Sequence, residues 1–93
     1  MAILGGWNID EMKGANLPQK VQSAFTAVTG GIVGAEYMPV LYVGSQPVSG
    51  TNYCVLAVQT LTVVQPEKHL VKMVINEAVN GVFSLVSVSG IMV

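Results

Sequence analysis

Residues 36–64, EYMPVLYVGSQPVSGTNYCVLAVQTLTVV, decide the fold of this chain. Two runs within them, 36–45 and 51–64, are rich in β-branched and aromatic residues and predict two strands. The segment between the runs, residues 46–50, contains proline, serine and glycine, which are common turn residues. The stretch therefore predicts a β-hairpin at the centre of the chain, and Pro39 predicts an edge position or a bulge in its first strand.

Two further strands are expected after this hairpin. Residues 65–67 contain a proline and predict a turn, and residues 68–76 then alternate between two faces as a strand does. Residues 76–81 end in Asn80-Gly81, a strong hairpin pair, and residues 82–89 form the last predicted strand. Because these connections are short, an antiparallel meander is the favoured topology.

One helix is expected before the hairpin. Asn16 predicts an N-cap, Pro18 is tolerated in the first turn, and Gly30-Gly31 predict the C-terminal end. An apolar face recurs at helical spacing over Leu17, Val21, Ala24, Phe25 and Val28. A meander with one apolar face has to be covered, and one helix is present to cover it. Residues 1–93 therefore predict a single α+β domain with one helix packed across an antiparallel sheet.

Composition narrows the classes of function. The chain has 93 residues, 52% hydrophobic and 10% charged, with a formal net charge of −1. Four Lys and Arg residues are too few for a nucleic-acid footprint, and no segment reaches the roughly 18 apolar residues of a membrane span. The start of the chain lacks the pattern of a signal peptide, and Cys54 is a single cysteine. A reducing, cytoplasmic location is the simplest expectation.

The segment SQPVSGTNY, residues 45–53, resembles the first hairpin loop of the cystatins. Gln46, Val48 and Gly50 supply the Gln-x-Val-x-Gly pattern of that family, and the likeness is strongest to its intracellular, stefin-like (type 1) branch. This resemblance implies one helix across a four- to five-stranded antiparallel sheet, with the N-terminal tail as the extra strand. It also implies reversible, non-covalent inhibition of papain-like cysteine proteases, in which the inhibitor plugs the active-site cleft and performs no catalysis.

The resemblance implies a contact edge built from three parts. Their residues are Gly5, Gly6 and Trp7 in the tail, Gln46, Pro47, Val48, Ser49 and Gly50 in the first hairpin, and Ala78 and Val79 in the second. The chain departs from the family at position 47, where valine is more usual, and in the second turn, which lacks the Pro-Trp of many secreted members. Each part also has a plain structural interpretation: a hairpin loop, a flexible terminus with Trp7 packed on the core, and an ordinary turn.

A catalytic alternative would pair Cys54 with His69, with Asn76 or Asn80 as the orienting group. Cys54 lies within the most apolar strand, where a buried thiol is ordinarily an inert small hydrophobe. One histidine and one cysteine do not make a metal site, and paired carboxylates and phosphate loops are absent from the sequence. We therefore expect neither an enzyme nor a cofactor or metal.

The strand at 51–64 is apolar on both of its faces, which indicates burial on both sides. Self-association into a homodimer is therefore also expected, either through the outer face or by exchange of the helix and first strands. Exchange would open residues 46–50 into a continuous strand, and Pro47 makes the bond before it a candidate for slow isomerisation. The alternative function is a non-inhibitory cystatin-fold interaction module that self-associates or binds a non-protease partner.

Overall fold

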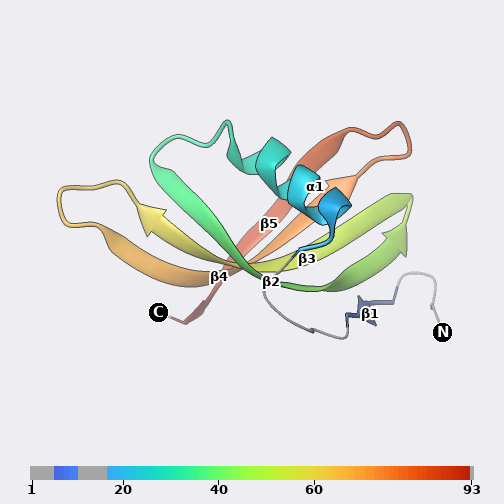
Figure 1. Cartoon of the computed structure of the whole chain (residues 1–93), viewed down its shortest axis with the longest axis horizontal. Helices are drawn as coiled ribbons and strands as arrows, with labels where there is room; N and C mark the ends of the chain where they lie inside the picture. The colour runs from blue at the N-terminus through green and yellow to red at the C-terminus, as the bar shows by residue number, and fades with distance from the viewer. Residues whose placement is uncertain (1–5, 11–16, 93) are drawn as a thin grey trace.

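The structure, a computed structural model, describes residues 6–10 and 17–92 (Figure 1). Its elements are β1 (Asn8–Ile9), α1 (Gln19–Thr29), β2 (Ala35–Val48), β3 (Gly50–Leu61), β4 (Glu67–Glu77) and β5 (Phe83–Met92). The strands form one five-stranded sheet in the order β1-β2-β3-β4-β5, and every neighbouring pair is antiparallel. Helix α1 lies across one face of this sheet (Figure 1). The α+β arrangement and the antiparallel meander that the sequence predicts are confirmed.

Helix α1 follows the apolar spacing in the sequence. Its buried residues are Val21, Ala24 and Phe25. The first helical hydrogen bond runs from the Gln22 amide to the Pro18 carbonyl at 2.9 Å, so the helix starts just after the proline. Gly30 closes the last turn, donating from its amide to the Thr26 carbonyl at 3.0 Å. The predicted cap, Asn16, lies outside the described residues.

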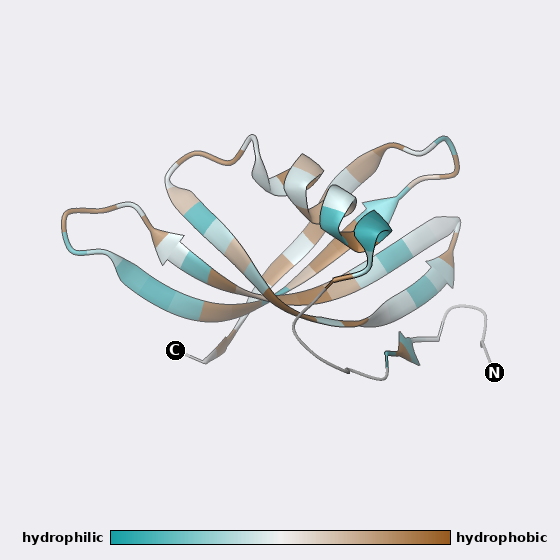
Figure 2. Ribbon diagram, in the orientation of Figure 1, coloured by the Kyte–Doolittle hydropathy of each residue, from teal (hydrophilic) through white to brown (hydrophobic). Residues whose placement is uncertain are grey.

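The core lies between α1 and the central strands. Alternate residues of β3 and β4 face the helix, as expected for a strand with one covered side. They are Tyr53, Val55 and Ala57 of β3 and Val71, Met73 and Ile75 of β4. Figure 2 shows apolar residues along the middle of the sheet's strands, on the part of the sheet near α1. The intervening residues, Cys54 and Leu56 among them, face the opposite side, which we call the outer face.

Strand β2 is long and irregular. Its register against β3 shifts between Pro39 and Leu41 and again between Tyr42 and Gly44. The first shift confirms the bulge that Pro39 predicts, since proline disturbs a regular ladder. Strands β2 and β3 also continue into the segment expected to be a loop, where Gln46 pairs with Asn52. Only the residues around Ser49 are left to turn the chain.

The strand predicted over residues 51–64 is too long at its end. Strand β3 stops at Leu61, which pairs with Glu67, and residues 62–66 make the turn. Val64 is fully exposed, and the Thr62 amide donates to the Gly34 carbonyl at 3.0 Å. The apolar run continues past the last strand pair, so hydropathy alone places the boundary three residues too late.

Candidate functional site

The three predicted contact segments come together at one end of the sheet (Figure 1). Asn8 pairs with Ser45, so residues 6–7 run on toward the turn between β2 and β3. Thr51 pairs with Glu77, which brings the turn between β4 and β5 beside the first. We call residues 6–8, 46–51 and 77–82 the hairpin end. Gly5, also expected to contribute, lies outside the described residues.

The first turn is tight and is fixed by Gly50. Val48 pairs with Gly50 around Ser49, and Gly50 has a φ of 96°. A Cβ at this position would also collide with the backbone oxygen of Glu77 on the neighbouring strand. Both features exclude a side chain, so the glycine of the motif has a structural role whatever the turn contacts. Val48 and Ser49 are exposed and form the outermost part of this turn.

A ladder of side-chain amides braces the outer face just behind the first turn. Asn52 donates to the Gln46 side-chain oxygen at 3.0 Å, and Asn76 donates to the Asn52 oxygen at 2.9 Å. The ladder joins β2, β3 and β4 in one row. Gln46 is therefore engaged within the sheet rather than presented at the tip. The supporting amides of Asn52 and Asn76 were not recognised from the sequence, although their place in strand-like runs was a signal for cross-strand bonding.

A second network braces the opposite face. The Tyr53 hydroxyl donates to Oε1 of Glu77 at 2.8 Å, and Nζ of Lys20 lies 3.2 Å from Oε2 of the same carboxylate. Burial and the bond to Glu77 raise the pKa of Tyr53 to about 12. The bond from Tyr53, followed by the contact with Lys20, holds the pKa of Glu77 below its usual value. The start of α1 is thereby tied to the strands that carry the hairpin end.

The second turn presents two exposed apolar side chains, Val79 and Val82. The Ala78 amide donates to the Val82 carbonyl at 2.9 Å, and the Val82 amide lies 3.2 Å from the Asn80 side-chain oxygen, which accepts its hydrogen bond. Ala78 is half-buried, whereas the side chain of Val79 is 83% exposed. Of the two residues predicted here, Val79 is the one available for contact.

The N-terminal strand crosses close to the sheet at Gly44. A Cβ on Gly44 would collide with the Asn8 backbone, and the Asp10 amide donates to the Val43 carbonyl at 2.7 Å. Trp7 lies on the outer face with 40% of its surface exposed, not in the core beneath α1. Sequence reasoning missed Gly44, although a glycine inside a strand-like run is a known sign of close backbone approach.

Cys54 and His69 do not form a pair. Cys54 lies opposite Val74 on β4, and His69 lies five residues away along that strand, at a position that alternates to the other face. Nε2 of His69 is instead 3.4 Å from a carboxylate oxygen of Glu67. Burial raises the pKa of the Cys54 thiol, which opposes formation of a nucleophilic thiolate.

Comparisons of the chain with protein-family models, with curated proteins and with solved structures gave no match. Within residues 6–10 and 17–92, no group of three or more His, Cys, Asp or Glu side chains is arranged to hold a metal ion. The same residues include no helix of the length and apolarity needed to cross a membrane. Function is therefore inferred from the residues and geometry of the hairpin end.

Proposed function

We propose that this chain is a stefin-like, reversible and non-covalent inhibitor of papain-like cysteine proteases. The observation that carries the proposal is the meeting of residues 6–7, the first turn and the second turn at one end of the sheet. A cleft built for an extended peptide accepts a narrow edge of backbone with small or apolar tips. The hairpin end offers Gly6, Val48 and Val79 for that purpose.

The braces on both faces support this function physically. The Gln46–Asn52–Asn76 ladder and the Tyr53–Glu77 bond hold the two turns before any partner arrives. A preorganised edge loses less conformational entropy on binding, so more of the contact energy appears as affinity. The inhibitor contributes no catalytic residue and no cofactor in this scheme. A reducing compartment such as the cytoplasm suits its lone cysteine.

Titration of papain with the purified protein tests the proposal. We expect inhibition at micromolar concentrations or below, and we expect Val48→Asp to weaken it about tenfold or more, since a charge would enter an apolar contact. Val64→Asp is the matched control, because Val64 is fully exposed in the turn between β3 and β4. Circular dichroism checks that each variant is folded. Absence of inhibition by the folded parent protein would remove the proposal.

A second candidate is a non-inhibitory module that self-associates. The edge strand β5 favours it, because no charged residue occurs after Glu77 in the sequence. Exposed apolar side chains on this strand are Leu85, Val86, Val88 and Ile91. Natural edge strands are commonly protected by charges, so this edge is suited to pairing with another strand. Light scattering coupled to size exclusion tests it: Val86→Lys should reduce association and Val64→Lys should not, while a monomer at every concentration eliminates it.

A further inference from the structure

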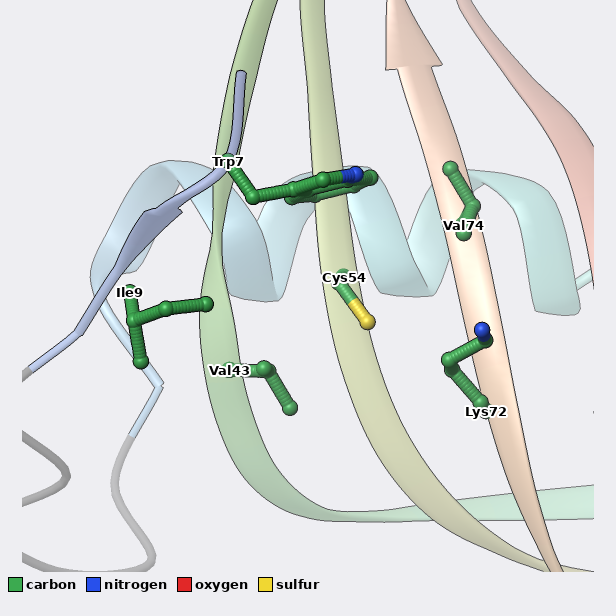
Figure 3. A pocket seen from close by; sticks show the side chains of 6 residues that line it. All are labelled: Trp7, Ile9, Val43, Cys54, Lys72 and Val74. Atoms are coloured by element: carbon green, nitrogen blue, oxygen red, sulfur yellow. The ribbon is translucent and has the colours of Figure 1, made fainter. Parts of the chain in front are cut away.

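A cavity of about 200 Å³ opens on the outer face, away from α1. Its lining residues are Trp7, Ile9, Val43, Cys54, Lys72 and Val74, which come from the N-terminal segment and from β2, β3 and β4 (Figure 3). An apolar cavity of about 150 Å³ is enough to bind a benzene-sized molecule. The cavity is therefore large enough for one small ring with a short polar group.

The walls of the cavity are apolar, and Trp7 supplies the largest of them. Figure 3 shows its indole extending across β3 toward Val74, with the Cys54 thiol beside it and Val43 on the neighbouring strand. Cys54 is only 5% exposed. An indole face favours offset or edge contacts with another ring. The geometry thus suits a flat, compact apolar body.

Lys72 is the charged residue of the lining. It makes no ion pair with any residue that the structure describes, whereas Lys20 is paired with Glu77. Its cross-strand neighbours, Leu56 and Ser89, are uncharged. The Lys72 charge also lowers the pKa of the Cys54 thiol, against the stronger effect of burial. An ammonium group beside an apolar cavity is complementary to a single negative charge.

We propose that this cavity binds a small aromatic monocarboxylic acid, with its ring between Trp7 and Val43 and its carboxylate at Lys72. A ligand with several charges would leave most of them facing apolar walls, so a monoanion is the better match. The site depends on the close passage of the N-terminal strand over Gly44, since that passage brings Trp7 over Cys54. The cavity shares Trp7 with the hairpin end, but its other lining residues lie outside that end, so the proposal does not rest on protease inhibition.

Benzoate is the probe for this site, and Trp7 reports on it because it is the only tryptophan in the sequence. We expect a saturable change in tryptophan emission with a dissociation constant of about 1 mM, the strength expected of so small a ligand in a half-open site. Benzyl alcohol, which keeps the ring without the charge, should bind more weakly. Acetate, which keeps the charge without the ring, should not saturate in the same range.

Charge variants decide the role of Lys72. Lys72→Gln should weaken benzoate binding about fivefold and leave benzyl alcohol unchanged, as expected for a partly exposed ion pair. Lys68→Gln is the matched control. It removes the same charge from the same strand, four residues away and outside the cavity. Lys72→Arg should retain most of the affinity. Thermal unfolding of each variant verifies that the fold is kept.

Several results would overturn the proposal. Equal affinity for benzoate and benzyl alcohol, or equal effects of Lys72→Gln and Lys68→Gln, would show that no carboxylate is recognised. Benzoate that leaves Trp7 emission and the amide resonances of Cys54 and Val74 unchanged well above millimolar concentration would show that the cavity is not a site. A change in Trp7 emission on dilution alone would show that a second copy of the chain fills the cavity instead.

Discussion

Replacing Gly50 with alanine separates a structural role of the motif from a contact role. Gly50 has a φ of 96°, and a Cβ there would collide with the Glu77 backbone oxygen. Left-handed backbone alone costs an L-residue roughly 1–2 kcal/mol, and the collision forces a further shift between β3 and β4. We therefore expect Gly50→Ala to lower the free energy of unfolding by at least about 2 kcal/mol.

Thermal unfolding followed by circular dichroism measures this loss. For a domain of this size, about 2 kcal/mol corresponds to a fall in Tm of about 10 °C. Val48→Ala is the comparison, because Val48 is 39% exposed and lies in the same turn. Its removal should change stability by only about 0.5 kcal/mol, the usual range for a surface position. Inhibition of papain should show the larger effect for Val48→Ala when both proteins are folded at the assay temperature.

A Gly50→Ala protein with a Tm within about 2 °C of the parent would refute the structural role. It would mean that the turn relaxes freely and that the observed backbone is not required. A Val48→Ala protein that inhibits as well as the parent would refute the contact role of the turn, since Val48 is its exposed apolar tip. The two outcomes are independent, because one concerns the free monomer and the other concerns the complex.

Four further predictions concern stability and reactivity. Met73→Ala should destabilise by about 2–5 kcal/mol in urea unfolding, because Met73 is fully buried and its loss leaves a cavity in the core. Glu77→Gln should have a lower Tm than the parent at neutral pH, because a carboxylate with a lowered pKa stabilises the fold only while it is ionised. The difference in Tm should disappear as the pH falls below about 4. Tyr53→Phe should lessen the loss of stability expected between about pH 10 and pH 12, because the phenol pKa is raised to about 12 in the fold. Native Cys54 should react with a thiol reagent far more slowly than the denatured chain, and fast native reaction would contradict its burial.

The sequence predicts those features of the fold that depend on local periodicity. Val21, Ala24 and Phe25 recur at helical spacing and all three are buried. Pro39 predicts an edge position or a bulge because a proline lacks the donor that a regular ladder needs, and the structure has the bulge. The end of β3 was misplaced because strand pairing, not hydropathy, decides where a strand stops, and Val64 has no partner opposite it.

The site was predicted less completely because its supports are contacts between distant residues. The Asn52–Asn76 bond joins residues 24 positions apart, and nothing local in the sequence indicates that register. Gly44 needs to be glycine only because Asn8 passes over it, which becomes visible once β1 is placed. The motif residue Gln46 was expected at the contact edge, yet its side chain bonds to Asn52 within the sheet. The spacing of the motif residues therefore predicts where the turn lies. Which of those residues support the turn and which are exposed for contact is visible only in the structure.

The same turn links the two proposed functions. Exchange of α1 and β2 between two copies would convert residues 48–50 from a turn into extended strand, so Gly50 would leave its positive φ. The pairing of Gln46 with Asn52 would re-form between copies, which leaves the turn itself as the main local difference between the two states. The positive-φ strain of alanine at position 50 would exist only in the closed turn, so its relief should shift the balance toward the exchanged dimer while the stability of the monomer falls. Because the closed turn carries Val48, association and inhibition would compete for one short segment, and inhibition by Gly50→Ala should recover on dilution if exchange is the cause of its loss.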